Sequence, residues 1–290
     1  MAWEHTPVAQ QTSDPDVPAV AAAAPGAYDP ATFWETRLRA RFDVAAAGFR
    51  GLGRTFNEAL YRQRDVVLRR ALRRYRLRVD GADIVELGPG SGFYVSGWKA
   101  RGVRSLVGLD ITTVVAERLS AAYPEYRFER ADITERWPVP DASADIVTAF
   151  DVLFHIVDDD RFEAALTEAG RVLRPGGYLL ISDLFLHGST FRGFHQVGRT
   201  IDTYTATLDA AGLEVVGRLP IFVTMHPAID VPAGWRRSLA DQWWSALEAK
   251  LVKSPRLGRR IGTVLFWIDR ALTLPLRGGP STELMVARRR

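Results

Sequence analysis

The sequence has no cysteine and no long hydrophobic run. Without cysteine it can form no disulfide framework, no cysteine-ligated zinc site and no thiol nucleophile, which fits a reducing cytoplasm. No stretch of about 18 apolar residues is present, so no transmembrane helix is expected. Residues 1–30 lack the basic start and apolar run of a signal peptide, and their alanine- and proline-rich composition predicts a disordered tail. We therefore expect a cytoplasmic protein.

The net charge of the protein excludes few classes of binding partner. The net charge is +4, and arginine supplies most of the basic side chains. Nucleic acid, an anionic membrane surface and a phosphorylated substrate all fit this excess. Residues 34–49 and 56–77 carry arginines among apolar residues at helical spacing, so both are predicted helices within a cap over residues 31–80. Their arginines fit an anion-binding face, but we favour a solvated face with basic stems on apolar surface.

Strands and helices alternate in residues 81–225, the predicted core. Strands are expected over residues 82–87, 105–110, 126–132, 144–152, 177–185 and 213–223, and helices over residues 92–100, 114–123, 161–173 and 202–211. This alternation predicts crossover units, a mainly parallel sheet and helices on both faces. Residues 226–280 interrupt the pattern as a helical insert, a lid or an interface, and residues 281–290 form a last strand and a basic tail.

The stretch VELGPGSGFY, residues 85–94, leads a buried strand into a turn with Gly88, Gly90 and Gly92. Glycines let the backbone turn tightly and approach a ligand, and the helix that follows offers unpaired N–H groups at its start. Dinucleotide enzymes use a related turn, so this pattern alone does not identify the ligand.

Three acidic residues narrow the choice of ligand. Asp110 ends the second strand, where a carboxylate can accept hydrogen bonds from both ribose hydroxyls, and Asp132 follows the third strand, where it can accept from an adenine amine. Both could instead cap the helices that follow. Glu86, at the end of the first strand, suits a ligand with a cationic amine and a sulfonium better than one with two phosphates. The charge therefore favours S-adenosylmethionine over NAD.

Taken together, the motifs resemble class I S-adenosylmethionine-dependent methyltransferases. The resemblance covers about residues 84–183, with weaker support to residue 222 and at the last strand, and it rests on the ordered motifs VELGPGSGFY, GLD, RADI, FDVLFHI and RVLRPGGYLLISD. It implies a Rossmann-like α/β fold with seven strands, mainly parallel, in which the last strand is antiparallel and lies beside the fifth.

The resemblance also implies roles for individual residues around S-adenosylmethionine. The methionine part would face Glu86, Gly88, Gly90, Gly92, Phe93 and Tyr94. Asp110 would hold the ribose with Ile111 against the adenine, and Asp132 and Ile133 would meet the adenine amine. Phe150 and Asp151 would line the methyl-transfer mouth, although Asp151 could equally cap a turn. Tyr61 and Arg64 resemble N-terminal residues that close over the methionine end.

Methyl transfer needs an aligned acceptor, exclusion of water and, for some acceptors, a base. Candidate catalytic residues are Asp151, His155, which follows the fourth strand, and His195, which follows the fifth. A structural role for His155, bonded to backbone, stays open. The acidic run at residues 158–160 precedes a predicted helix, where acids suit the helix dipole, so no metal site is expected.

The acceptor is expected to be a small molecule. The NPPY signature of amide-methylating enzymes is absent, since the fourth strand ends in FDVL. The methyl acceptor can then be an oxygen, nitrogen or carbon atom of a specialised metabolite. Methylation of a carbon atom of a prenyl diphosphate is a minority hypothesis. Candidate substrate residues, which could equally be loop, packing or interface residues, are Arg192, Arg199, Phe222, Trp235 and Trp243.

Other functions stay open on the sequence alone. The arginine-rich N-terminal helices could track RNA phosphates, so RNA methylation is the alternative, although no RNA-binding module is recognisable and nucleic acid is not the expected partner. The third hypothesis is a NAD-binding or non-catalytic cofactor-binding protein. The presence of Glu86, Asp110 and Asp132 disfavours it. Homo-oligomers and peripheral membrane contact through the C-terminal helices both fit the sequence.

Overall fold

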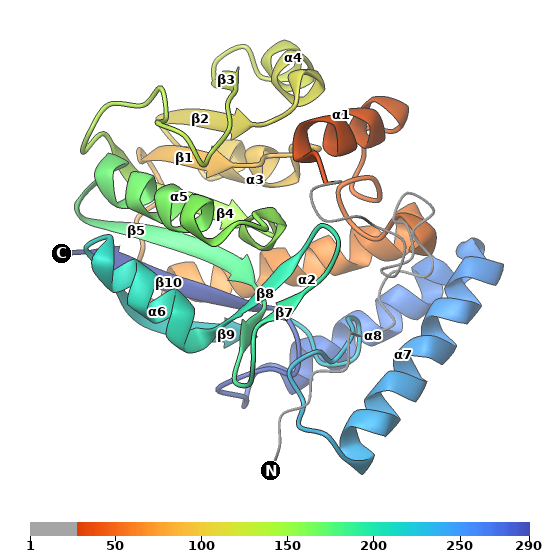
Figure 1. Cartoon of the computed structure of the whole chain (residues 1–290). Coiled ribbons are helices and arrows are strands. Elements are labelled where there is room, and N and C mark those ends of the chain that lie inside the picture. The colour runs from red at the N-terminus through yellow and green to blue at the C-terminus, as the bar shows by residue number, and fades with distance from the viewer. Residues whose placement is uncertain (1–27) are drawn as a thin grey trace.

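The centre of the protein is a seven-stranded sheet, seen in a computed structural model that describes residues 28–290 (Figure 1). The expected tail therefore lies almost wholly outside the described residues. The strand order is β3-β2-β1-β4-β5-β10-β9, and β10 is antiparallel to both of its neighbours while the other pairs are parallel. The predicted mainly parallel sheet with an antiparallel last strand beside the fifth is confirmed.

Both faces of the sheet are buried, because its strands carry apolar residues on both sides. Ile84 packs into one hydrophobic core and its neighbour Val85 into the other. Such strands require helices on both faces. The strands are β1 (Asp83–Leu87), β2 (Ser105–Asp110), β3 (Arg127–Arg130), β4 (Ala144–Phe150), β5 (Leu173–Asp183), β9 (Leu213–Pro220) and β10 (Glu283–Arg289).

Helices cover the two faces unequally. In Figure 1, α5 and α6 lie on the near face, while α2, α3 and α8 lie behind the sheet and α1 stands at the edge where the parallel strands end. The α-helices are α1 (Pro30–Ala40), α2 (Arg54–Arg74), α3 (Phe93–Ala100), α4 (Thr113–Ala122), α5 (Asp159–Val172), α6 (Ile201–Ala210), α7 (Trp235–Lys253) and α8 (Gly258–Leu272).

The first helix is shorter than the predicted one over residues 34–49, which was wrong beyond residue 40. Asp43 turns the chain, since its Oδ1 accepts from the backbone N–H groups of Ala45 and Ala46 at 2.9 and 3.1 Å. Arg37 then donates to the carbonyls of Ala46 at 2.6 Å and Gly48 at 2.7 Å. These side-chain bonds satisfy the backbone outside a helix, so the helical spacing of residues 41–49 does not decide their structure. A short 3₁₀ turn, η2 (Arg50–Leu52), then leads into α2.

A small second sheet, which the sequence did not predict, follows β5. Strand β8 (Val197–Thr200) pairs in parallel with β6 (Phe185–Leu186) and antiparallel with β7 (Phe191–Arg192). The hairpin between β7 and β8 carries His195. It therefore brings a residue that follows the fifth strand next to η3 (Leu153–His155), which follows the fourth.

The expected helical insert consists mainly of α7, η4 (Pro255–Leu257) and α8. Helix α8 packs closely on α2, where a Cβ added to Gly262 would lie 2.8 Å from the Cβ of Ala59. Asp269 anchors α8 because its buried carboxylate accepts the backbone N–H groups of Val223, Thr224 and Met225. Among residues 28–290, no helix is both long and apolar enough to cross a membrane.

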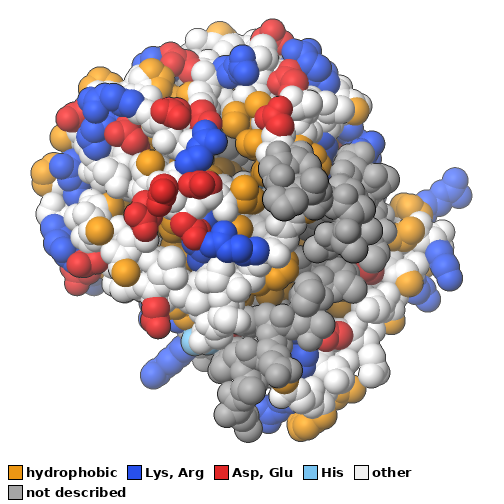
Figure 2. All heavy atoms as spheres, in the orientation of Figure 1, with side chains coloured by type: hydrophobic (Ala, Val, Ile, Leu, Met, Phe, Trp, Pro, Cys, Tyr) orange, Lys and Arg blue, Asp and Glu red, His pale blue; other side chains and the backbone are white. Residues whose placement is uncertain are grey.

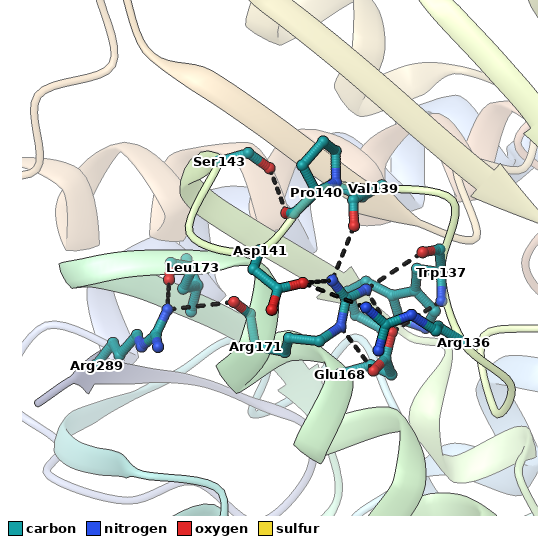
Figure 3. Close-up of polar contacts among 10 residues, drawn as sticks. All are labelled: Arg136, Trp137, Val139, Pro140, Asp141, Ser143, Glu168, Arg171, Leu173 and Arg289. Atoms are coloured by element: carbon teal, nitrogen blue, oxygen red, sulfur yellow. Dashed lines mark hydrogen bonds and ion pairs between the residues drawn. The ribbon is translucent and has the colours of Figure 1, made fainter.

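An arginine network ties the edge of the sheet opposite the cavity described below (Figure 3). Arg171 on α5 binds both carboxylate oxygens of Glu168 at 2.8 and 2.6 Å and donates to the carbonyls of Trp137 and Val139. Arg289 on β10 donates to the backbone carbonyl of Arg171 at 3.2 Å. The network thus fixes the β3–β4 connection and the last strand to one helix.

Replacing Arg171 with Met should lower the free energy of unfolding by about 3 kcal/mol, because it leaves Glu168, whose side chain is 13% exposed, without its cation. Urea denaturation measures this. The matched control is Arg136→Met, which removes a 71% exposed arginine of the same network and should cost less than about 0.5 kcal/mol. Equal losses of unfolding free energy in the two variants would contradict the stabilising role of the Arg171–Glu168 pair.

Candidate active site

A cavity opens at the carboxyl ends of β1, β2, β3 and β4. The strand ends and the glycine turn form its floor, and Trp34 and Leu38 of α1 line its other side. Parallel strands bring their carboxyl ends to one edge, so residues that are distant in sequence meet there. The predicted residues that line this cavity are Tyr61, Gly88, Gly90, Phe93, Tyr94, Asp110, Ile111, Asp132, Ile133, Phe150, Asp151 and His155.

The glycine turn requires glycine for steric reasons. Gly88 has φ +58°, and a Cβ there would lie 2.5 Å from Cγ2 of Val152. Its N–H donates to the carbonyl of Leu109 at 2.8 Å, which fixes the turn to β2. The turn therefore exposes backbone to the cavity in a shape that a side chain would prevent.

Two Asp-Ile-Thr turns with the same hydrogen bonds follow β2 and β3. Asp110 Oδ1 accepts from Thr112 at 2.9 Å (N–H) and 2.7 Å (hydroxyl), and Asp132 Oδ1 accepts from Thr134 at the same two distances. Neither aspartate caps a helix, because Thr112 is the N-cap of α4 and no helix lies between β3 and β4. The turns present Ile111 and Ile133 to the cavity as an apolar slot. The repeated DIT letters were a signal that the sequence analysis did not use.

The second carboxylate oxygens of the two aspartates differ. Asp132 Oδ2 is held by Arg161 at 2.6 Å. In the part of the chain that the structure describes, Asp110 Oδ2 accepts only a long hydrogen bond, 3.4 Å, from the N–H of Gly90. Burial raises the pKa of Asp110 above its ordinary value, against the opposing bonds from Thr112 and Gly90. Asp110 thus keeps accepting capacity toward the cavity.

Glu86, like Gly92, is not among the residues that line the cavity, although the resemblance predicts that both face the methionine part. Glu86 is 2% exposed, and within residues 28–290 its Oε2 accepts no hydrogen bond of normal geometry. Burial raises the pKa of Glu86 to about 8, against the opposing effect of the Trp98 indole N–H. A buried carboxylate oxygen that accepts no hydrogen bond is costly. Glu86 therefore fits a site that receives a cationic ligand group.

Helix α1 is held over the cavity by a long-range helix cap. Glu35 Oε2 accepts from the N–H groups of Thr113 at 2.7 Å and Val114 at 3.3 Å, at the start of α4. A carboxylate at a helix N-terminus also suits the helix dipole. The sequence analysis missed Glu35 and its neighbour Trp34, because neither belongs to a recognised motif.

Arg64, which the resemblance places at the methionine end of the cofactor, does not line this cavity but forms a buried ion pair with Asp151, which does. Arg64 Nε lies 2.7 Å from Asp151 Oδ2, and the Ser182 hydroxyl donates to Asp151 Oδ1 at 2.9 Å. Asp151 has φ +57°, a left-handed conformation that aspartate tolerates at some cost. The guanidinium also lies 5.1 Å from the ring centre of Tyr61 and 5.0 Å from that of Phe222.

A second pocket adjoins the first. The two share Trp34, Ala47, Asp151 and His155, so they meet at the Arg64–Asp151 pair. Aromatic rings and basic groups dominate the lining of the second pocket, which includes Arg37, Phe49, Arg50, Arg64, Phe154, His195, His226, Trp244 and Glu248. Burial lowers the pKa of His226 to about 3, and the positive charge of Arg64 adds to this shift, so the His226 ring is neutral.

His155 and His195 are stacked at this junction, with ring centres 5.3 Å apart. His155 Nδ1 lies 2.9 Å from the carbonyl oxygen of His195. A carbonyl only accepts, so in the neutral ring Nδ1 carries the proton and Nε2 keeps its lone pair. Burial, then the charges of His195 and Arg37, hold the pKa of His155 well below 6.5.

Several predicted substrate residues lie outside both pockets. Arg192 and the buried Arg199 both bind Asp159, and Arg199 also donates to the carbonyl of Ile156 at 2.8 Å, so both fix the start of α5. Trp235 is 69% exposed at the start of α7, and Trp243 donates to the Thr224 carbonyl.

The neighbouring Trp244, rather than Trp243, lines the second pocket. Phe222 lies behind that pocket, with its ring stacked on His226 at 5.3 Å between centres. His187, another histidine after β5, binds Asp230 at 2.5 Å and lines neither pocket.

Comparison with known proteins identifies the family. Residues 85–181 match the family described as a methyltransferase domain. A Mycolicibacterium smegmatis protein, provisionally named an S-adenosylmethionine-dependent methyltransferase, is 31% identical over 198 residues, which are 63% of this chain and 74% of that protein. The 27-O-demethylrifamycin SV methyltransferase of Amycolatopsis mediterranei is 39% identical over 99 residues, 30% of this chain and 35% of that protein.

A solved structure supports the fold. A provisionally assigned sarcosine dimethylglycine methyltransferase from Galdieria sulphuraria has a TM-score of 0.52 at 19% identity, covering 77% of this chain and 84% of that one. The family match, and not the fold, decides between the two cofactors, so the NAD-binding alternative is dropped. The chain belongs to the class I S-adenosylmethionine-dependent methyltransferases, and S-adenosylmethionine is its cofactor.

Proposed function

We propose that this enzyme methylates a small molecule bound in the second pocket, with His155 taking the acceptor proton. The observation that carries the proposal is the shared wall: His155 and Asp151 line both pockets, so a cofactor in one and an acceptor in the other would meet there. Such proximity is the main requirement of an in-line transfer.

The first pocket would hold S-adenosylmethionine through the residues already described. Asp110 would accept from the ribose hydroxyls, Ile111 and Ile133 would enclose the adenine, and Asp132 would accept from its amine. The glycine turn and Glu86 would face the methionine part, where the orphaned carboxylate oxygen suits an ammonium group. When bound, the cofactor supplies an electrophilic methyl group on a cationic sulfur.

The lining of the second pocket indicates the class of acceptor. Phe49, Phe154 and Trp244 offer flat apolar walls, while three arginines bring more positive charge than Asp151 and Glu248 offset. Pockets of this kind bind an apolar body oriented by few polar groups. We infer an acceptor with a ring-shaped apolar body and a hydroxyl or anionic group, which fits a specialised metabolite.

His155 is the base that the geometry supports best. The neutral tautomer fixed by the His195 carbonyl leaves Nε2 able to accept a proton, and both pockets contact the ring. Asp151 is a weaker candidate, since Arg64 and Ser182 already hold its two oxygens. His195 then acts as a positioning residue through its backbone carbonyl.

The relatives give limited support for the acceptor. The Amycolatopsis protein is named for methylation of a hydroxyl oxygen of an antibiotic, which agrees with a hydroxyl acceptor here. The match spans 99 residues, 30% of this chain, so the acceptor proposal depends mainly on the second pocket.

Asp110→Asn should weaken S-adenosylhomocysteine binding about ten- to a hundredfold, because it removes a charged acceptor worth about 1.5–3 kcal/mol. The amide oxygen can still accept from Thr112, so the turn should persist. Calorimetric titration measures the affinity, with NAD as a negative control. Unchanged affinity in the variant would remove Asp110 from the ribose site.

Cofactor binding should release a proton from Glu86 at neutral pH. The raised pKa of about 8 keeps Glu86 protonated there, and a bound ammonium group favours its ionised form, so affinity should rise with pH toward 8. Titration of S-adenosylhomocysteine in buffers of different ionisation enthalpy measures the released proton. Work between about pH 6 and 7.5 keeps the ligand amine charged. Glu86→Gln should abolish the release; release that persists in this variant would contradict the role.

His155→Asn should reduce turnover about 10²- to 10⁴-fold, since it removes the base while its amide can still donate to the His195 carbonyl. The low pKa of His155 predicts that wild-type turnover does not fall with protonation of this ring until the pH is well below 6.5. A screen of hydroxylated ring compounds with a deuterated methyl donor, read by mass spectrometry, supplies the acceptor.

The matched control for this variant is His187→Asn, whose histidine binds Asp230 outside both pockets and should keep full turnover. S-adenosylhomocysteine affinity should be the same in both variants. Labelling of RNA but of no small acceptor would overturn the proposal.

A further inference from the structure

Helix α8 has a second apolar face that points to solvent. Val264, Trp267, Ile268 and Leu272 lie at helical spacing and are 60%, 57%, 40% and 41% exposed. Two further exposed leucines, Leu274 and Leu276, follow directly in the chain. We call these six residues the outer face of α8.

The outer face is not needed for packing within the protein. The opposite side of α8 carries Gly258, Gly262, Leu265, Phe266 and Asp269, all buried, and it is this side that meets α2. A surface helix normally shows one apolar stripe and one polar face. A helix with two apolar faces indicates a partner on the second.

The surroundings of the outer face are cationic. Between residues 249 and 282 the only acidic residue is Asp269, which is fully buried and satisfied by backbone N–H groups. The same segment and the adjoining turn expose seven basic residues: Lys250, Lys253, Arg256, Arg259, Arg260, Arg270 and Arg277. On the face shown in Figure 2, basic and hydrophobic side chains also lie interspersed along the edge where Figure 1 shows α7.

Arginines of α2 extend this charge. Arg70 donates to the carbonyl of Thr273 at 2.9 Å at the end of α8. Burial, followed by repulsion from Arg270, Arg73 and Arg74, lowers the pKa of Arg70. The basic groups around the end of α8 are therefore close enough to repel one another.

We propose that the outer face of α8 binds the surface of a lipid bilayer that contains anionic phospholipids. The apolar residues would enter the boundary between headgroups and acyl chains, and the surrounding arginines and lysines would meet the lipid phosphates. Tryptophan, with an apolar ring and a polar N–H, suits this boundary.

The same charges disfavour other occupants. A second copy of the chain would place one cationic surface against another, which costs free energy. RNA would match the charge, but it would leave the six apolar side chains without a partner. An anionic bilayer satisfies both features at once.

Co-sedimentation with vesicles tests the proposal on the full chain. Wild type should bind vesicles of phosphatidylcholine mixed with phosphatidylglycerol, bind phosphatidylcholine alone more weakly, and lose binding as salt is raised. The decisive variant is Ile268→Asp, and the control is Thr263→Asp, which adds the same charge at an exposed position of the same helix outside the outer face. Ile268→Asp should bind at least about tenfold more weakly than the control.

S-adenosylhomocysteine affinity, measured in each variant, reports folding independently of vesicle binding. If Ile268→Asp does not fold, Leu272→Asp takes its place. Equal binding by the variant and the control would overturn the proposal. Two other results, each without binding to anionic vesicles, would also overturn the proposal. One is a wild-type dimer in sedimentation velocity that Ile268→Asp dissociates, and the other is salt-sensitive RNA binding.

Discussion

The ion pair between Arg64 and Asp151 joins the two parts of the molecule on which function depends. Arg64 comes from the N-terminal helix α2 and Asp151 from the end of β4, and both are largely removed from water. Loss of either partner would leave a buried charge without compensation, which is strongly destabilising. The cap is therefore bound to the sheet at the point where the two pockets meet, and the pair limits how either pocket can change shape.

Around this pair, the candidate active site combines carboxylates whose oxygens are already hydrogen-bonded with carboxylates that can still accept a hydrogen bond. Asp132 is held by Thr134 and Arg161, whereas Asp110 has one oxygen with only a long bond, and Glu86 has one that accepts no hydrogen bond of normal geometry among the described residues. Desolvation raises the pKa of Asp110 and Glu86. Such groups destabilise the free protein and favour a ligand that supplies the missing donors or positive charge.

The insert after β9 links this chemistry to the surface. Helix α7 lines the second pocket through Trp244 and Glu248, and α8 packs on α2, the helix that carries Arg64. The inner side of α8 thus supports the active site, while its outer face is apolar and surrounded by cations.

The sequence by itself determined the strands of the main sheet, most of the helices and the edge where the glycine turn and the acidic strand ends meet, because short apolar runs, helical spacing, glycine turns and acidic strand ends are local patterns. It placed Asp110 at the end of the second strand, and in the structure Asp110 lies next to Gly90 of the glycine turn. Tertiary structure alone decided which of the adjacent Trp243 and Trp244 faces the pocket, since the two side chains point about 100° apart and only the packing of α7 sets its rotation. It also decided that His155 contacts His195, and that Arg199 binds Asp159 at the start of α5. These contacts join residues about 40 positions apart, and only the packing of separate elements fixes them.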